Sequence, residues 1–224
     1  IHTLFESAPA LTSGLRAAYE ALGKDGVTIA TFAGDSGTLD IGFQALSAQA
    51  ARGDDVIHFC CDNEVAMNTG GQANAASPYG AVTPTTPSGA PYFKKDGPAI
   101  MAAHGIPYVA TAAVSHADDF VRKVRTAKET GGMCYLHVLT PCPLAWKYDP
   151  DETLAVSRLA VESGMWKLYE VVRGVRRVTY VPETRLPVRD YLRSQGRFDA
   201  LPEDEVERLQ RRVDESREDT GVTS

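Results

Sequence analysis

Apolar and polar residues along this chain follow two different periods. Short apolar runs bounded by turn residues predict buried strands, and longer segments with apolar residues three or four apart predict helices. We predict strands at 27–32, 56–61, 108–113 and 133–139. We predict helices at 11–22, 41–52, 98–104, 117–130 and 153–163. This alternating order is typical of an α/β fold, with a largely parallel sheet and helices on both faces.

A long segment between residues 68 and 97 interrupts the alternation. Glycine and proline recur along it with serine and threonine between them, so regular secondary structure is not expected there. A loop of this length inside a compact domain usually has a function or is disordered. The segment is therefore a candidate binding loop.

The chain changes character after residue 150. A hairpin-like stretch at 168–181 leads into a polar arm, in which Val206, Leu209 and Val213 share one helical face. This helix could dock on a partner subunit or on its own chain, and the pattern does not decide between them. We divide the chain into an α/β domain, 1–150, and a C-terminal extension, 151–224, whose helical arm is expected to pack on partner subunits.

Composition narrows the class of protein. The 224 residues are 43% hydrophobic and carry a net charge of -6, which argues against nucleic acid or an anionic membrane as the main partner. No apolar run approaches the ~18 residues of a membrane span, and the first residues lack the features of a signal peptide. Four cysteines in a chain this long do not suggest a disulfide framework, so a reducing cytoplasm is the expected compartment.

Candidate chemistry lies where two predicted strands end. Gly34-Asp35-Ser36-Gly37 follows the first strand, and Asn63, 28 residues after Asp35, follows the second. A tight turn before a helix presents backbone N–H groups to phosphate oxygens, and Asp35 and Asn63 offer oxygen ligands that suit Mg²⁺. Without a metal, Asp35 would be a helix-capping residue and Asn63 an ordinary turn residue. Because ligands bind at the carboxyl ends of parallel strands, a metal-bound diphosphate is the stronger interpretation.

The same residues carry a family resemblance. The pattern G-D-x-G followed by D-N-E resembles the thiamine diphosphate motif. The longer segments 34–47, 62–72 and 77–81, continued by 139–143 and 191–198, resemble the thiamine-binding β subunit of the pyruvate:ferredoxin oxidoreductases, within the 2-oxoacid:ferredoxin oxidoreductase family. The resemblance covers nearly the whole chain and implies the thiamine diphosphate-binding fold.

The resemblance also assigns residues to the cofactor. It implies that thiamine diphosphate is bound by Gly34, Asp35, Ser36, Gly37, Thr38, Asn63, Val65, Asn68 and Thr69. Mg²⁺ would be coordinated by Asp35, the side chain of Asn63 and the backbone oxygen of Val65. Asn68 would lie near the reactive thiazolium carbon, as the catalytic candidate. The glutamate that contacts the pyrimidine belongs to another domain or subunit in the family, so Glu64 is not given that role.

Ser36 departs from the family, which generally has glycine at this position. A serine could still donate to a phosphate. If the backbone there required a positive φ, however, serine would be strained.

Cys142 stands between two prolines after the last predicted strand of the α/β domain. A lone cysteine is most often a small buried hydrophobe. The resemblance instead implies one of four ligands to a [4Fe-4S] cluster, with the other three in an N-terminal segment that precedes residue 1 of this chain or in another polypeptide. Cys60, Cys61 and Cys134 lie within predicted strands and are interpreted as structural.

The histidines show no metal-binding spacing. His58 and His137 fall in predicted strands and are interpreted as core residues, while His104 and His116 are expected near helix ends. None is assigned to catalysis.

The resemblance implies oxidative decarboxylation of a 2-oxoacid, most simply pyruvate, to acyl-CoA and CO₂. Electrons would pass through iron–sulfur clusters to ferredoxin or another acceptor, and other subunits of the complex would be partners, with coenzyme A as co-substrate. Other 2-oxoacids, such as phenylglyoxylate, oxalate and branched-chain acids, stay open. Two alternatives are a non-redox thiamine decarboxylase or synthase and a catalytically degenerate subunit that only binds partners.

Overall fold

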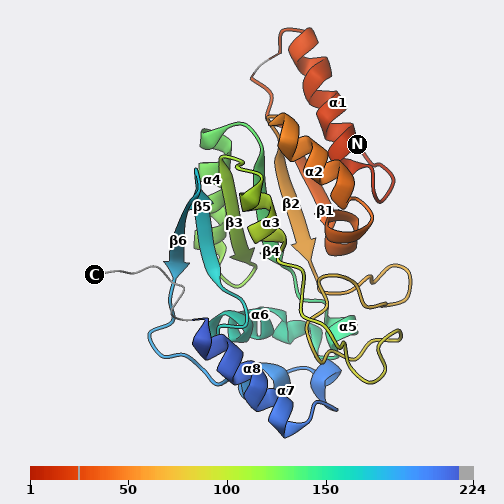
Figure 1. Cartoon of the computed structure of the whole chain (residues 1–224), viewed down its shortest axis with the longest axis vertical. Helices are drawn as coiled ribbons and strands as arrows, with labels where there is room; N and C mark the ends of the chain where they lie inside the picture. The colour runs from red at the N-terminus through yellow and green to blue at the C-terminus, as the bar shows by residue number, and fades with distance from the viewer. Residues whose placement is uncertain (25, 217–224) are drawn as a thin grey trace.

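The computed structural model describes residues 1–24 and 26–216, and within them six strands form one sheet (Figure 1). The strand order is β1-β2-β4-β3-β5-β6, in which the first four strands are parallel and β5 and β6 are antiparallel additions. The strands are β1 Ala30–Gly34, β2 Ile57–Asp62, β3 Tyr108–Ala113, β4 Cys134–Leu139, β5 Leu168–Val172 and β6 Val175–Tyr180. The predicted α/β fold with a largely parallel sheet is confirmed.

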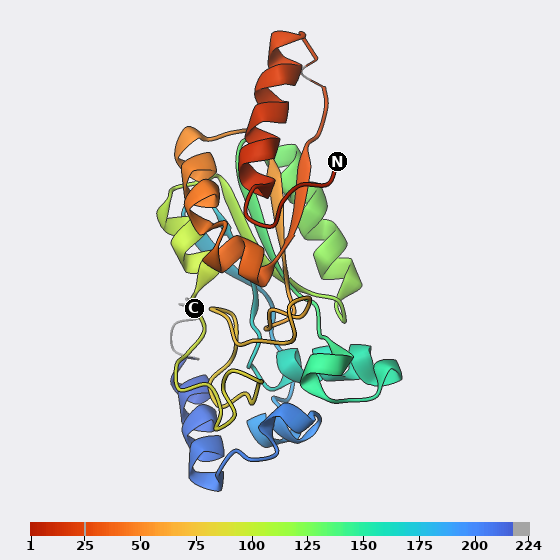
Figure 2. The same cartoon turned by 90° about the vertical axis from the view of Figure 1, so that its right-hand side faces the viewer.

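Helices cover both faces of this sheet. They are α1 Ala8–Ala21, α2 Phe43–Arg52, α3 Gly97–Ala103, α4 Ala117–Thr130, α5 Pro143–Trp146, α6 Thr153–Glu162, α7 Val188–Arg193 and α8 Glu203–Glu215. Leu46 of α2 and Met101 of α3 pack with Val109 on one face, and Ala127 of α4 packs with Tyr108 on the other. Figure 2 shows α2 and α3, in orange and yellow-green, on one side of the sheet and α4, in green, on the opposite side.

Three elements start two or three residues from their predicted positions. Helix α1 begins at Ala8 rather than residue 11. The first strand begins at Ala30 rather than residue 27, because β1 is an edge strand whose pairing with β2 starts at Ala30 and Ile57. The helix predicted from residue 41 begins at Phe43, since a π-helical turn, Ser36–Asp40, occupies the residues after β1. The polar face and short length of an edge strand weaken the local signal that pattern analysis uses.

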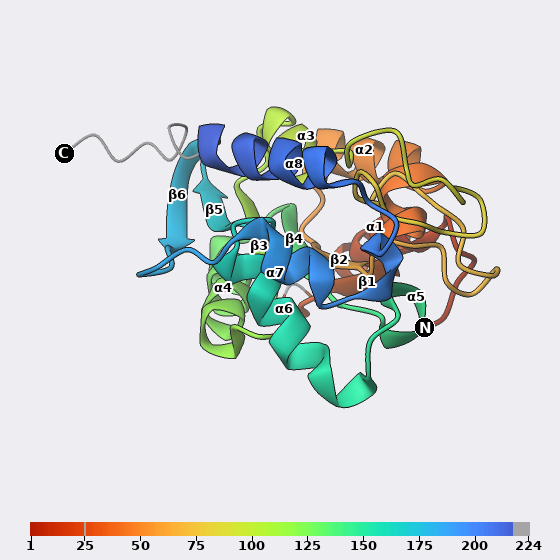
Figure 3. The same ribbon diagram turned by 90° about the horizontal axis from the view of Figure 1, so that it is seen from below.

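The C-terminal part closes the end of the sheet at which the parallel strands finish. Trp146, Tyr191, Leu209 and Val213 are buried in one cluster with Leu139, the last residue of β4. Seen from below, α6, α7 and α8 extend across this end of the molecule (Figure 3). The apolar face predicted for α8 therefore docks on its own chain, and residues on both sides of position 150 share one core. Residues 217–224, the end of the predicted arm, lie outside the described residues.

In the arm, the sequence spacing i,i+4 predicts the ion pairs Asp204–Arg208 and Glu207–Arg211, of which only the second forms. Glu207 lies 3.7 Å from Arg211, whereas Arg208 pairs with Glu205 at 3.4 Å instead of Asp204. Within residues 1–24 and 26–216, no helix combines the length and the apolar character that crossing a membrane requires.

Candidate functional site

The turn after β1 contains most of the predicted diphosphate-binding residues. β1 ends at Gly34, and the Asp35 carboxylate then accepts a hydrogen bond of 2.7 Å from the Ser36 backbone at the start of the π-helical turn. Thr38 is fully buried and lies 3.2 Å from the His58 ring. The predicted junction of a strand and a helical segment is confirmed at this turn.

Ser36 is accommodated without backbone strain. It is not among the described non-glycine residues with positive φ, and it lies in the helical turn. Its hydroxyl accepts a hydrogen bond of 2.7 Å from the side-chain amide of Asn74. Asn74 belongs to the long glycine- and proline-rich loop and was not singled out by the sequence, because nothing local links it to Ser36. Position 36 therefore does not require a positive φ, and the serine there is not strained.

Two glycines near this turn have different surroundings. A Cβ added at Gly34 would meet nothing within 4 Å, so the space beside it is open. A Cβ at Gly42 would collide with the backbone oxygen of Gly37, which leaves no room for any side chain. The open side of Gly34 lets another group approach the backbone closely, whereas Gly42 serves the packing of the turn itself.

The predicted metal ligands meet at one backbone N–H. The amide of Val65 donates to Asp35 across 3.0 Å and to the side-chain oxygen of Asn63 across 3.2 Å. A carboxylate oxygen and an amide oxygen from the turns after two neighbouring strands are thus held close together. An all-oxygen donor set of this kind suits a hard cation such as Mg²⁺.

The electrostatics also fit a cation. Burial, together with the nearby negative charge of Asp62, raises the pKa of Asp35 to about 7, although hydrogen bonds from Asn74 and Ser36 oppose the shift. Burial alone would raise the pKa of Asp62 as well, but Lys94 and His137 hold it below the usual range. Asp35 is therefore the carboxylate that lacks a countercharge, and a divalent cation beside it would supply one.

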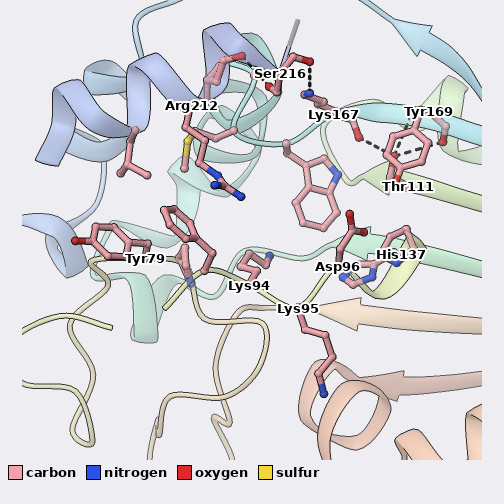
Figure 4. Close-up of a pocket in the computed structure, with 18 of the residues that line it drawn as sticks. Tyr79, Lys94, Lys95, Asp96, Thr111, His137, Lys167, Tyr169, Arg212 and Ser216 are labelled. Atoms are coloured by element: carbon pink, nitrogen blue, oxygen red, sulfur yellow. Dashed lines mark hydrogen bonds between the residues drawn. The ribbon is translucent and has the colours of Figure 1, made fainter. Parts of the chain in front are cut away.

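A buried ion cluster surrounds the turn after β2. Lys94 lies 2.9 Å from Asp62 and 2.6 Å from Glu64, and Arg197 lies 2.6 Å from the second carboxylate oxygen of Glu64. His137 contacts Asp62 at 2.7 Å. Lys94 and His137 also line a pocket of about 480 Å³ (Figure 4). Both carboxylate oxygens of Glu64 are thus engaged by cations of the same chain.

The loop that carries Asn68 and Thr69 lies at the surface. The Thr69 hydroxyl donates to the Gln72 side-chain oxygen, the Gln72 amide donates back to the Thr69 backbone oxygen, and an isolated bridge pairs Ala66 with Gln72. Asn68 is exposed, and Gly70 and Gly71 line a pocket of about 370 Å³ between this loop and α5. Asn68 and Thr69 themselves are not among the residues that line this pocket.

Cys142 is half-buried and lies immediately before α5. All four cysteines are free, and burial raises the pKa of the Cys134 thiol to about 12, which suits a structural residue. In the part of the chain that the structure describes, no group of three or more His, Cys, Asp or Glu side chains gathers in a way that could hold a metal. The Asp35 and Asn63 pair differs from such a group because it contains only one carboxylate.

The histidines occupy the predicted places. His58 is fully buried, and burial followed by the charge of His137 lowers the pKa of His58 to about 3. His137 is also buried, while His104 and His116 lie at the ends of α3 and α4.

Comparison with known proteins gives consistent matches. Residues 1–138 match the family model described as the thiamine pyrophosphate enzyme, C-terminal TPP binding domain. "Pyruvate synthase subunit PorB" of Methanothermobacter thermautotrophicus is 51% identical over 219 residues, covering 96% of this chain and 76% of the relative. The protein of the same name from Methanocaldococcus jannaschii is 46% identical over 227 residues, with the same coverage.

A more distant relative and a solved structure extend the comparison. "Ketoisovalerate oxidoreductase subunit VorB" of Pyrococcus furiosus is 38% identical over 225 residues, covering 95% of this chain and 72% of the relative. The 2-oxoglutarate:ferredoxin oxidoreductase of Magnetococcus marinus superimposes with a TM-score of 0.58 at 23% identity, covering 71% of this chain and 59% of that one. At this identity the superposition bears on the fold alone.

Proposed function

The chain belongs to the thiamine pyrophosphate-binding β subunits of the 2-oxoacid:ferredoxin oxidoreductases, and on this premise we propose that its complex oxidises pyruvate. The products are acetyl-CoA and CO₂, with electrons passed through iron–sulfur clusters to ferredoxin. Relatives named pyruvate synthase subunits are 51% and 46% identical to the chain, against 38% for a relative named for ketoisovalerate. This ranking supports pyruvate as the first substrate to test.

The observation that carries the proposal is the meeting of Asp35 and Asn63 at the Val65 amide. Asp35, the Asn63 side chain and the Val65 backbone oxygen hold Mg²⁺. The turn from Gly34 to Thr38 receives the diphosphate, with the open side of Gly34 allowing close approach. When bound, thiamine diphosphate supplies the chemistry that allows a 2-oxoacid to lose CO₂.

Asn68 and Thr69 act at the reacting end of the cofactor. Asn68 is exposed on its turn, and the hydrogen bonds between Thr69 and Gln72 fix the shape of that turn. An exposed amide can donate to or accept from a substrate. We assign Asn68 to orienting the 2-oxoacid and Thr69 to holding the loop against the cofactor.

Cys142 supplies one thiolate to a [4Fe-4S] cluster. It lies half-buried directly before α5, whose Trp146 contacts the turn after β2. Four thiolates are the usual requirement for such a cluster. The other three ligands come from outside the described residues, either from the same polypeptide or from a partner.

Partner subunits complete the enzyme. Both groups of relatives are named as subunits, which supports a hetero-oligomeric complex. Leu154, Val175 and Val181 of the C-terminal extension are large apolar residues with more than half of their surface exposed, which suits subunit contacts. Coenzyme A is the acyl acceptor, and ferredoxin is the electron acceptor.

The test is anaerobic isolation of the complete complex from its native source. Thiamine diphosphate, magnesium and iron are measured, and viologen reduction is assayed with pyruvate, with and without coenzyme A. Reduction that depends on coenzyme A supports the full proposal. Activity with ketoisovalerate but not pyruvate would move the substrate to the branched-chain acids, whereas cofactor without iron would indicate a non-redox decarboxylase. A complex without thiamine diphosphate would defeat the proposal and favour a degenerate subunit.

A further inference from the structure

Four charged side chains, three of them buried and Lys94 partly exposed, form a compact cluster beside the metal-ligand turn. Asp62 ends β2, Glu64 lies in the turn that follows, Lys94 ends the long loop, and Arg197 lies in the C-terminal extension. Asp62, Glu64 and Arg197 have at most 5% of their surface exposed. Two carboxylates face two cations, so the charges balance, as burial requires.

Glu64 has an unusual backbone conformation. Its φ is 63°, in the left-handed region, which costs a non-glycine residue about 1–3 kcal/mol and persists only where the surroundings impose it. Its surroundings hold it firmly, since Lys94 engages one carboxylate oxygen and Arg197 the other, both at 2.6 Å, and its backbone N–H donates to Asp62 across 2.8 Å. The residues on either side of Glu64 are Asn63 and Val65, the proposed metal ligands. The conformation of Glu64 therefore sets the direction of both.

Arg197 is itself rigidly held. Its Nε donates to Gln195 across 2.6 Å, its Nη2 donates to the Tyr191 hydroxyl across 3.1 Å, and its guanidinium lies 3.7 Å from the Trp146 ring. Trp146 in turn donates to the backbone oxygen of Asn63 across 2.8 Å. Residues from beyond β4 thus hold the turn at two consecutive positions, Asn63 through Trp146 and Glu64 through Arg197.

We propose that Lys94, Glu64 and Arg197 are positioning residues that preset Asn63 and Val65 for the divalent cation, so that the C-terminal extension controls metal affinity. The inference rests on the proposed function, because it takes Asn63 and Val65 as metal ligands. It assigns no contact with substrate or cofactor to the three residues. Outer-shell partners of this kind typically change metal affinity by about 10–100-fold when they are replaced.

The test measures metal binding directly rather than turnover. The complex is stripped with a chelator, supplied with saturating thiamine diphosphate and titrated with Mn²⁺, and free Mn²⁺ is read by electron paramagnetic resonance. Glu64→Gln keeps the shape but loses the charge, and we expect its Mn²⁺ dissociation constant to rise by about 10–100-fold. Glu64→Gly relieves the backbone but removes the carboxylate, and we expect a rise of similar size.

A matched control separates positioning from general destabilisation. Glu170 is also buried and pairs with Arg122 at 3.1 Å and with the Tyr108 hydroxyl at 3.0 Å, but it lies on β5, separated from β2 by β4 and β3. Glu170→Gln is expected to lower the unfolding temperature while leaving the Mn²⁺ dissociation constant unchanged. If Glu64→Gln fails to assemble, Arg197→Lys takes its place, because it keeps the charge but loses the planar contact with Trp146.

The outcomes are distinguishable. A wild-type complex that binds no Mn²⁺ in the presence of thiamine diphosphate overturns the proposed function. Wild-type binding together with equally tight binding by Glu64→Gln or by its stand-in Arg197→Lys overturns the positioning inference alone. Tight binding by Glu64→Gly would also overturn it, because the turn would then need only a permissive backbone.

Discussion

The indole N–H of Trp146 donates a hydrogen bond of 2.8 Å to the backbone oxygen of Asn63, 83 residues earlier in the chain. Trp146 is fully buried and ends the short helix that follows Cys142. One side chain thus connects the proposed cluster ligand, through α5, to the turn that carries the proposed metal ligands. The donor matters because a partly buried carbonyl that loses its partner is costly.

Replacing Trp146 by phenylalanine should therefore weaken both stability and cofactor binding. Loss of the donor leaves the Asn63 oxygen unsatisfied, at a cost of about 1–3 kcal/mol in unfolding free energy. Trp166→Phe is the matched control, since Trp166 donates across 3.0 Å to the backbone oxygen of Ala112. Chemical denaturation should show a lower unfolding free energy for both variants. Thiamine diphosphate titration should show weaker binding only for Trp146→Phe. Equal cofactor affinities in the two variants would contradict the link.

Metal-free protein should lose stability as the pH rises towards about 7. Because the folded-state pKa of Asp35 is raised to about 7, the native state holds a proton that the unfolded state has already lost. The free energy of unfolding therefore falls by roughly 1–4 kcal/mol between the ordinary carboxyl pKa and about pH 7. Asp35→Asn should remove this pH dependence, although it loses one of the two backbone N–H contacts that the carboxylate accepts. Thermal unfolding of metal-free wild type and variant at about pH 5 and about pH 8 measures the difference. An unchanged pH dependence in the variant would contradict the role of Asp35.

Magnesium affinity of the wild type should depend on pH through the same group. Mg²⁺ requires the ionised carboxylate of Asp35, so a proton competes with the metal below about pH 7. The apparent affinity should fall about tenfold for each pH unit below that value and level off above it. Titration calorimetry with Mg²⁺ in buffers of different ionisation heat should also detect one proton released. A flat profile would remove Asp35 from the ligand set.

Ser36→Gly, which restores the residue usual in the family, should retain cofactor binding. The backbone at position 36 is helical and has no need of a positive φ. The variant loses the contact from Asn74 and gains chain entropy in the unfolded state, so we expect a loss of about 1 kcal/mol in stability. Denaturation and thiamine diphosphate titration measure the two effects. A large loss of affinity would mean that the hydroxyl itself contacts the diphosphate.

Alanine substitutions at Gly34 and at Gly42 should distinguish a glycine that leaves room for the ligand from a glycine that the packing of the turn requires. The Cβ at Gly34 meets open space, so Gly34→Ala should fold normally but bind thiamine diphosphate less tightly if the ligand uses that space. The Cβ at Gly42 collides with the Gly37 backbone, so Gly42→Ala should lose several kcal/mol of stability. Unfolding and binding curves on both variants check this. Normal binding by Gly34→Ala would place the diphosphate elsewhere.

Much of the fold could be predicted because its signals are local. Periodicity placed β3 and α4 at their observed bounds, and the turn residues after β1 and β2 indicated where a ligand would bind. The carboxyl ends of parallel strands share one edge, and Asp35 and Asn63, which follow two neighbouring strands, come together there at the Val65 amide. Short elements such as α5 and α7 escaped prediction because one or two turns leave little periodic pattern.

The sequence by itself therefore determined the order of elements and the chemistry at the strand ends, since both depend on residues within a few positions of one another. Only the tertiary structure decided what surrounds that chemistry. Glu64 finds its two cations 30 and 133 residues away, and burial raises the Asp35 pKa only after Asp62 and the turn are packed together. Contacts of such sequence separation arise from how the chain folds back on itself, and no local pattern encodes them.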